Sequence, residues 1–317
     1  MLQDIAPKQL DCAFKKECPQ INDFLLYSED KFFLMKTSEY GYEFPTFEDT
    51  VVTSLLGVEL YENRGERLEK LCQQYGVFRT IAVDNTAFFA VDSKEIFRKD
   101  VTLEMVHKSK LKHYEPAYIY FGIVTADQIK RWYNKHKYCG KCGNQTSFSG
   151  TERAIVCKKC GEINYPQICP AVTISIVHDG KILLARNRNG TFRKYGQIAG
   201  YVEVGETFED TVRREAFEET GLHVTNIKYY KNQPWALTDA HMIGYTAEVD
   251  GSAEVNLQEE ELWDARWFAA NEIPEDIADV SLTYEMIGNF RKKYLKESDC
   301  DNSQQYRESF EIKKKHS

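Results

Sequence analysis

The alternation of apolar and polar residues is clearest between residues 171 and 187. This stretch reads AVTISIVHDGKILLARN, in which two runs of β-branched and aliphatic residues flank the dipeptide Asp179-Gly180. Such residues are enriched in strands, and Asp-Gly favours the tight turn of a β-hairpin. The pattern therefore predicts two antiparallel strands joined at Asp179 and Gly180.

A helix is expected over Phe208–Thr220, and its apolar positions recur at helical spacing: Phe208, Val212 and Ala216. Thr207, with Asp210 three residues later, predicts the N-terminal cap, and Gly221 predicts the C-terminal stop. Further strands are expected at Ile227–Tyr230, His241–Glu248 and Ala265–Phe268. Strands on both sides of a helix along the chain predict an α/β sandwich.

The first 130 residues show shorter and weaker patterns. Strand-like runs occupy Asp23–Tyr27, Lys31–Met35 and Ala87–Val91, and one helix is expected over Glu62–Tyr75. A connecting helix is expected over Thr125–His136, with Thr125 as its N-terminal cap. We therefore expect an α+β domain at 1–130, a cysteine-rich segment with its leading helix at 131–168, an α/β domain at 169–297 and a polar tail at 298–317.

Composition narrows the classes of protein. The chain has 317 residues, a net charge of −8, 42% hydrophobic and 13% aromatic residues. That content suits a packed interior, and the negative charge argues against a protein that binds by neutralising a nucleic-acid backbone. The N-terminal sequence has no apolar segment typical of an export signal, and no apolar run is long enough to span a membrane. We therefore expect a cytoplasmic protein.

Four of the nine cysteines form two CxxC pairs, Cys139/Cys142 and Cys157/Cys160, separated by fourteen residues. This spacing lets two tight turns bring four thiolates to one ion, which is typical of a structural Zn²⁺ site. Because a four-thiolate shell is closed, the zinc should be structural. The alternatives are buried or redox-active cysteines and a ribbon that binds nucleic acid, and the net charge disfavours the second.

Acidic residues crowd the end of the helix expected over 208–220. With 3.6 residues per turn, Glu219 points into the apolar stripe, Glu215 lies at its border, and Glu218 lies beside Glu215. Carboxylates facing the protein interior need a cation, because unpaired buried charge is costly and like charges on one helix face repel. Mg²⁺ or Mn²⁺ prefers such ligands and can promote attack of water on a pyrophosphate. The residues themselves thus predict phosphoanhydride hydrolysis.

This segment also resembles the complete Nudix box: Gly200, five residues, Glu206, seven residues, Arg214-Glu215, two residues of which the first is aliphatic, Glu218-Glu219, one residue, Gly221-Leu222. The resemblance implies an α/β/α-sandwich Nudix domain preceded by the zinc ribbon and the α+β N-terminal domain. It implies metal binding through Glu215, Glu218 and Glu219. Glu206 would orient the loop or the metal shell, and Arg214 would hold the carboxylates by ion pairing.

Further motifs are similar to the NAD(H) pyrophosphatase branch, whose bacterial members also remove NAD caps from RNA: HKYCGKCG at 136–143, the second CxxC, Tyr165–Ile168 and Gln233-Pro234-Trp235. The resemblance covers about residues 115–274. It implies a homodimer with a structural zinc and a divalent-metal catalytic site. The chain departs from the branch at 236–240, where ALTDA replaces the usual PFPxS, so the preference for NADH over other substrates is left open.

The same resemblance indicates five substrate-binding residues: Tyr165, Tyr201, Gln233, Trp235 and Met242. An aromatic ring at Tyr201 would stack on the nicotinamide. For Tyr165, Tyr201 and Trp235 the alternative is core packing, and for Gln233 it is the capping of a turn. Glu261 is expected as a further metal ligand or as the base that deprotonates water, with Glu260 as the fallback and a solvated Glu259–Glu261 triplet as the alternative.

The hypothesis from the sequence is a metal-dependent hydrolase that splits NAD(H), free or as an RNA cap, into AMP and nicotinamide mononucleotide. One alternative is a pyrophosphatase for ADP-ribose or another nucleoside-diphosphate derivative. The other is a zinc-ribbon regulator that binds nucleic acid and carries an inactive Nudix domain.

Overall fold

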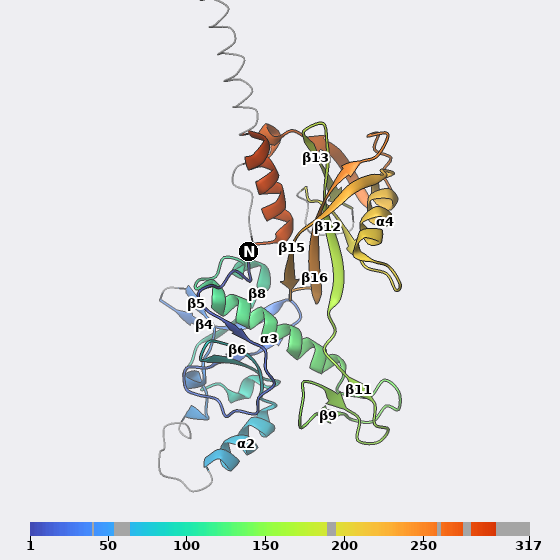
Figure 1. Cartoon of the computed structure of the whole chain (residues 1–317). Helices are drawn as coiled ribbons and strands as arrows, with labels where there is room; N and C mark the ends of the chain where they lie inside the picture. Colours follow the sequence, from blue (N-terminus) through green and yellow to red (C-terminus); the bar gives the residue numbers. More distant parts are fainter. Residues whose placement is uncertain (40, 54–63, 189–194, 259–260, 275–279, 296–317) are drawn as a thin grey trace, which may run out of the picture. The chain divides into compact units, whose positions relative to one another are not determined.

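The computed structural model describes residues 1–39, 41–53, 64–188, 195–258, 261–274 and 280–295. The chain forms two compact units. One comprises Leu2–Ile168 with the loop Ala236–Asp239, and the other comprises Cys169–Trp235 with Ala240–Ser317. Figure 1 shows the first unit mainly in blue and green and the second in yellow-green to red. The expected tail at 298–317 lies outside the described residues.

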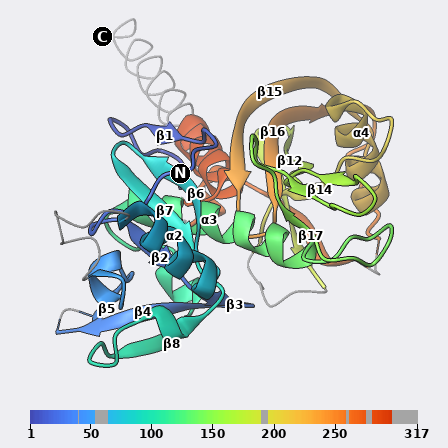
Figure 2. The same cartoon turned by 90° about the horizontal axis from the view of Figure 1, so that it is seen from below.

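The first unit is built on two small sheets (Figure 2). One has the order β1 (Leu10–Asp11), β6 (Phe78–Val83), β7 (Thr86–Ala90), β2 (Phe24–Leu26). In the other, β4 (Phe32–Ser38) pairs with β3 (Ser28–Glu29), β5 (Gly41–Glu43) and β8 (Leu103–His107). Short 3-10 helices occupy Phe47–Asp49, Lys94–Ile96 and Lys108–Leu111. The three strands expected here are confirmed.

Two helices accompany these sheets. Helix α2 spans Arg64–Tyr75, as expected. Helix α3 spans Ala117–Lys135 and packs on β6 and β7, so the prediction that it begins at Thr125 is wrong. The hydroxyl of Thr125 donates to the carbonyl of Phe121 inside the helix. The first two turns are buried almost all round, so they lack the amphipathic pattern that marks a helix in the sequence.

Three short strands of the cysteine-rich segment form a sheet of the order β11 (Ile163–Asn164), β10 (Ile155–Val156), β9 (Ser147–Phe148). Phe148 of β9 stacks on Tyr133 of α3 with ring centroids 4.4 Å apart, and both rings contact Phe78 of β6. This aromatic cluster joins the cysteine-rich segment to the helix and to the first sheet of the same unit.

The second unit is organised around one six-stranded sheet. Its main path is β15 (Val224–Trp235), β16 (Ala240–Val249), β12 (Cys169–His178), β13 (Lys181–Asn187), β17 (Leu262–Phe268), and β14 (Ile198–Tyr201) also pairs with β12. Only β12 and β16 run parallel. Asp179 and Gly180 have φ of 46° and 71°, which confirms the hairpin turn.

Helices cover both faces of this sheet (Figure 1). On one face α4 (Phe208–Thr220) buries Val212 and Ala216 against Leu183 of β13 and its neighbours. On the other face the helix at residues 282–295 shares a core with Ile182 and Leu184. Successive residues of β13 therefore pack alternately against the two helical layers, because side chains of a strand point to opposite faces of the sheet. A 3-10 helix at Ala270–Glu272 follows β17. The predicted α/β/α sandwich is confirmed.

Phe208 does not belong to the apolar stripe of α4. Its side chain is 40% exposed, whereas Val212 and Ala216 are fully buried. Phe208 is the first residue of the helix, one turn before the part that packs on β12 and β14. Helical spacing alone does not show where contact with the sheet begins.

Candidate active site and zinc centre

Helix α4 begins and ends as the sequence predicts. The hydroxyl of Thr207 accepts a hydrogen bond from the amide of Asp210 at 3.1 Å. At the other end Gly221 has a φ of 73° and donates its amide to the carbonyl of Phe217 at 2.7 Å. These caps satisfy backbone groups that the helix leaves free and fix which residues face the sheet.

Arg214 lies at the centre of the acidic cluster. Its guanidinium binds both carboxylate oxygens of Glu206, at 2.6 and 3.0 Å. It also donates to Glu215 at 2.7 Å, to Glu218 at 3.0 Å and to the carbonyl of Tyr201 at 2.9 Å. Such forked charge-assisted bonds hold planar groups in fixed orientations. Arg214 therefore joins the loop before α4, the helix itself and strand β14.

The environment of Glu206 favours the ionised carboxylate. The hydrogen bond from Arg214 has the largest effect, and bonds from the hydroxyl of Thr211 and the amide of Glu203 add to it, so that the pKa of Glu206 falls to about 2. Thr211 was not among the residues singled out from the sequence. The structure marks this residue by its burial: Thr211 is fully buried in the first turn of α4, where a polar side chain would be expected to face solvent.

Glu215 packs directly on the backbone of Gly200 in β14. A Cβ added to Gly200 would lie 2.0 Å from the Glu215 carboxyl carbon. The Glu215 side chain is buried, and this burial raises its pKa even though Arg214 opposes the effect. The first glycine of the motif is therefore needed because it leaves room for a carboxylate against the sheet.

Glu219 is the least compensated acid of the cluster. It is 7% exposed, and burial is the main cause that raises its pKa to about 8, followed by the charges of Glu215, Glu261 and Glu218. Within the ranges that the structure describes, we find no hydrogen bond to its carboxylate. A buried carboxylate without a donor, surrounded by further carboxylates, fits the oxygen-rich donor set of a divalent cation.

Glu261 lies immediately before β17 and is exposed. Its charge acts on both Glu215 and Glu219, which places it next to the cluster. Glu259 and Glu260 lie outside the described residues. Among the residues that are described, no three of the carboxylates bring their oxygens within 4.8 Å of one another. The metal ligands expected from the sequence therefore stay a prediction.

Three of the five expected substrate residues lie in one row across the sheet. Ala171 of β12 pairs with Tyr201 of β14 on one side and with Met242 of β16 on the other, and Met242 pairs with Gln233 of β15. Residues in register on neighbouring strands share a face. Tyr201 is 53% exposed, so it is not a core residue.

Gln233 is fully buried and holds the start of the helix at 282–295. Its amide nitrogen donates to the carbonyl of Val280 at 3.1 Å, and its amide oxygen accepts from the amide of Leu282 at 2.7 Å. These bonds favour the capping alternative for this residue. Trp235, two residues further on in β15, is half-buried on the same face. Tyr165 belongs to the other unit, is 55% exposed, and its hydroxyl donates to Glu152.

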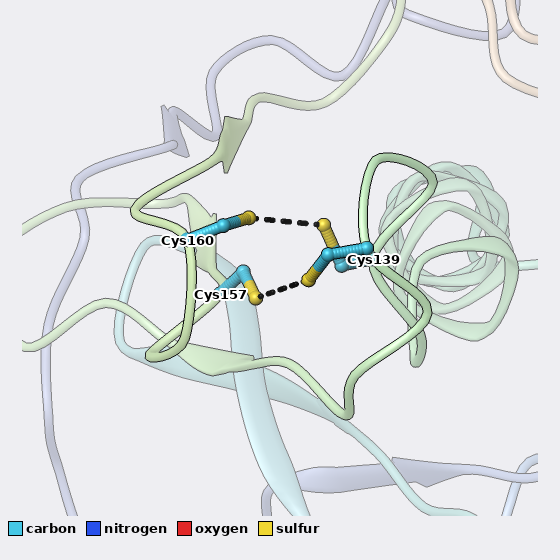
Figure 3. Close-up of side chains that lie close together, drawn as sticks. Cys139, Cys157 and Cys160 are labelled. Carbon is cyan, nitrogen blue, oxygen red and sulfur yellow. Dashed lines mark hydrogen bonds between the residues drawn. The ribbon is translucent and has the colours of Figure 1, made fainter.

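The four expected zinc ligands come together in the first unit. The Sγ atoms of Cys139, Cys142, Cys157 and Cys160 all lie within 4.8 Å of one another. Figure 3 shows the sulfurs of Cys139, Cys157 and Cys160 lying close together. The Sγ of Cys139 lies 3.6 Å from that of Cys160, and the Sγ of Cys142 lies 3.5 Å from that of Cys157. A tetrahedral ion with Zn–S bonds of about 2.3 Å would place sulfurs roughly 3.8 Å apart. The thiols therefore fit one Zn²⁺.

Both cysteine turns have the same backbone design. The amide of Gly143 donates to the carbonyl of Cys139, and the amide of Gly161 donates to the carbonyl of Cys157. The two glycines have φ of 73° and 75°, a left-handed conformation that glycine adopts without strain. The amide of Asn144 is the main cause that lowers the pKa of Cys142, whereas the pKa of Cys160 is raised, so Cys142 is the thiol of this pair that ionises first.

Comparison with known proteins agrees with this arrangement. The family model described as NUDIX domain matches residues 168–287, and the model described as NADH pyrophosphatase zinc ribbon domain matches residues 134–165. Residues 168–287 form a Nudix domain.

Over about half of its length the chain is similar to curated proteins named NAD-capped RNA hydrolase NudC. The protein from Actinobacillus succinogenes is 44% identical over 156 residues, which cover 47% of this chain and 59% of that protein. The one from Haemophilus influenzae strain PittGG is 42% identical over 154 residues, which cover 47% of this chain and 57% of that protein. The matches thus span less than two thirds of the relatives' length.

Among solved structures, a Nudix hydrolase from Nitrosomonas europaea has a TM-score of 0.43 and 22% identity, and it covers 49% of this chain and 90% of that one. In the described part of the present chain, none of the helices is long and apolar enough to cross a membrane.

The geometry of the Nudix domain defines what the site can do chemically. Arg214 neutralises Glu206 and shares its remaining bonds between Glu215 and Glu218, so most of the charge near Glu219 is left uncompensated. A pyrophosphate could bind here only together with cations, because carboxylates alone would repel it. The site is therefore suited to metal-assisted chemistry on a phosphoanhydride.

Proposed function

We propose that the protein hydrolyses the pyrophosphate bond of NAD(H), giving AMP and nicotinamide mononucleotide, and that NAD-capped RNA is a further substrate. The observation that carries this proposal is the buried carboxylate of Glu219, which has no donor among the described residues and lies beside Glu215 and Glu261. The similarity to proteins named NAD-capped RNA hydrolase supports the choice of substrate.

The proposed catalytic residues are Glu206, Arg214, Glu215, Glu218, Glu219 and Glu261. Glu215, Glu218, Glu219 and Glu261 would hold Mg²⁺ or Mn²⁺, which when bound would neutralise the phosphates and lower the pKa of water. Arg214 orients Glu206, Glu215 and Glu218 through its forked bonds. Glu261 is exposed and free to approach a water molecule, so it is the proposed base.

The row Tyr201, Met242 and Gln233 supports a binding surface for the dinucleotide. We propose that the exposed ring of Tyr201 stacks on a base and that Met242 contacts the dinucleotide from β16, on the other side of β12 from Tyr201. Gln233 contributes by fixing residues 280 and 282, since its amide is bonded to their backbone. Trp235 and Tyr165 remain proposed contacts on the basis of the sequence motif.

ADP-ribose or another nucleoside-diphosphate derivative is a second candidate substrate. The amide of Gln233 is engaged by the backbone, and the loop that follows Trp235 has the sequence ALTD, so neither provides an evident group that would select nicotinamide. A site built to hydrogen-bond one substrate group rejects analogues strongly, whereas an apolar site discriminates weakly. If no group selects nicotinamide, the protein should hydrolyse ADP-ribose as well as NADH.

The test compares product formation from NADH, NAD⁺ and ADP-ribose, each with Mg²⁺ and with Mn²⁺, by chromatography of the products. We expect AMP and nicotinamide mononucleotide from NADH, and about a hundredfold or greater loss of rate in Glu219→Gln, since removal of one electrostatic group from a preorganised site commonly has that effect. Glu254→Gln, at an exposed glutamate of the same unit, is the matched control. No turnover by the parent above background would refute the enzyme and favour the nucleic-acid-binding regulator, whereas equal, measurable rates in parent and Glu219→Gln would refute the role of Glu219.

We also propose that the protein is a homodimer in the cytoplasm. The resemblance to the NAD(H) pyrophosphatase branch supports the dimer, and four thiols arranged for metal binding suit a reducing compartment. Light scattering after size-exclusion chromatography measures the oligomeric state directly, and a mass of one chain, 36.8 kDa, would refute the dimer.

A further inference from the structure

A cavity of about 480 Å³ lies within the first unit, apart from the Nudix domain. Its walls come from the N-terminal arm at residues 14–19, helix α2, strands β6 and β7, helix α3 and the zinc ribbon next to β9. Figure 1 shows α2, β6, α3 and β9 in this unit. The volume lies in the range of sites for small organic ligands.

Aromatic and aliphatic side chains form much of the wall, among them Phe14, Phe78, Phe89, Ile129, Trp132 and Phe148. The rings of Phe78 and Phe148 contact each other with centroids 4.9 Å apart. Flat rings offer large contact areas at low entropic cost, and they favour a ligand that is itself flat. The body of the ligand should therefore be an aromatic ring system.

The wall also contains a buried donor without an acceptor. Trp132 is 5% exposed, and among the described residues its Nε1 has no hydrogen-bond partner. Arg79 lines the same cavity, and its buried Nε likewise makes no hydrogen bond, although a Glu17 oxygen lies 3.2 Å away in an ion pair. An unsatisfied buried donor destabilises the folded protein. An acceptor on a ligand would remove that destabilisation.

Two cations of the cavity lack a carboxylate partner. Arg153, from the zinc ribbon, donates to the carbonyl of Thr80, and burial is the main cause that lowers its pKa. Lys16, from the N-terminal arm, is exposed and lies over Gly150, its Nζ 3.8 Å from where a Cβ of that glycine would be. Within the described ranges neither has an acidic oxygen within 4.0 Å. The acids of the wall are already engaged, Glu17 by Arg79 and Glu69 by Gln73.

We infer that this cavity binds a small organic anion with a flat aromatic body, such as an aromatic carboxylate or phosphate. The ring system would lie against Phe78 and Phe148, and the anionic group would accept from Trp132 and pair with Arg153 and Lys16. The site is independent of the proposed hydrolysis, because none of its residues belongs to the Nudix domain.

The test is calorimetric titration of the full chain with 2-naphthoate, with 2-naphthyl phosphate and with the neutral 2-naphthylmethanol, without added Mg²⁺ or Mn²⁺. We expect each anion that fits to bind about tenfold or more tightly than the alcohol, because bonds to a charged group add to the apolar contact. The relative affinity of carboxylate and phosphate identifies the preferred head group.

Four variants locate the site. Trp132→Phe keeps the ring and removes the N–H, so we expect about tenfold weaker binding of the anions. Arg153→Gln should have a similar effect, and Lys16→Gln, at an exposed residue, should weaken binding several-fold. Trp263→Phe, an exposed tryptophan in β17, is the matched control and should leave the affinity unchanged.

Three outcomes would overturn the inference. They are the absence of saturable binding by either anion, equal affinity for the anions and the alcohol, and unchanged affinity in both Trp132→Phe and Lys16→Gln. Circular dichroism of each variant, together with its zinc content, shows whether the first unit remains folded. None of these three outcomes depends on whether Glu219→Gln loses NADH hydrolysis, so the cavity and the proposed function are tested separately.

Discussion

The carboxyl group of Glu215 lies against Gly200, 2.0 Å from the position that a Cβ of this glycine would take. The contact brings a helix residue to the sheet at a point where only a hydrogen can be tolerated. It also explains why Glu215 can be buried, since its carboxylate fills the space that a side chain on β14 would occupy.

Gly200→Ala is expected to displace Glu215 from this position. The added methyl group forces the carboxylate or the helix to move, which should cost about 1–3 kcal/mol of stability. Because a displacement of about 1 Å at a catalytic group can reduce the rate a hundredfold, NADH hydrolysis should fall by about that factor. Chemical denaturation and steady-state kinetics measure the two effects. Gly196→Ala is the matched control, because an added Cβ there would meet nothing within 4 Å and this glycine, like Gly200, has no positive φ.

Glu219→Gln is expected to make the protein more stable at high pH when no Mg²⁺ or Mn²⁺ is added. The pKa of this carboxyl is about 4.5 in an unfolded chain and about 8 in the folded protein. Ionisation therefore favours the unfolded state progressively as the pH rises from about 4.5 to about 8, by an amount on the order of a few kcal/mol. Denaturation curves at pH 4 and pH 8.5 check this.

At pH 4 the glutamate is neutral in both states, so parent and Glu219→Gln should then have similar stability. Added Mg²⁺ should reduce the difference at pH 8.5, because the ion stabilises the ionised carboxylate of the parent. A parent that is as stable as Glu219→Gln at pH 8.5 without added divalent cation would contradict the description of Glu219 as buried and uncompensated.

Arg214→Lys tests whether the forked geometry matters beyond the charge. Lysine keeps the positive charge but cannot bind both oxygens of Glu206 and reach Glu215, Glu218 and Tyr201 at once. We expect a fall in kcat of about one to two orders of magnitude with a smaller change in KM, since the carboxylates lose their orientation. Arg213→Lys, on the exposed side of the same helix, is the matched control. Equal kinetics for both variants would show that the charge of Arg214 alone suffices.

The features that could be predicted from the sequence depend on local signals. Asp179-Gly180 marks a turn, and Thr207 and Gly221 mark the ends of α4. Each CxxC pair is followed by a glycine of positive φ whose amide closes the turn on the carbonyl of the first cysteine. Each of these structures is determined by residues close together in the chain, so the pattern is visible without the fold.

Other features depend on contacts between distant residues. The start of α3 is not visible in the sequence because residues 119–124 are all buried and show no polar face. The role of Gln233 depends on backbone groups at Val280 and Leu282, and the row from Tyr201 to Gln233 depends on the register of four strands. No spacing in the sequence indicates these relationships.

Gln233→Leu is expected to destabilise the Nudix domain. Leucine of similar size leaves the carbonyl of Val280 and the amide of Leu282 without partners, which should cost about 2–4 kcal/mol for the two groups. Pro234→Ala, at the next residue of β15, controls for perturbation of the strand. If Gln233 acts through these backbone bonds, the loss is seen in denaturation without ligand, whereas a residue that only contacts substrate would change KM alone.

Cys160→Ser is expected to lose the zinc ion and destabilise the first unit. One of four thiolates is removed, and structural zinc contributes about 10–16 kcal/mol of binding free energy in isolated zinc-binding peptides, so even partial loss should be visible as a lower melting temperature. The stack of Phe148 on Tyr133 should loosen, because β9 is held beside the cysteine turns. Elemental analysis should give one zinc per chain in the parent and less than half of that in Cys160→Ser. Cys169→Ser, which changes an exposed cysteine outside the cluster, is the control and should keep one zinc per chain. Zinc bound at full occupancy in Cys160→Ser would mean that the four sulfurs do not form one site.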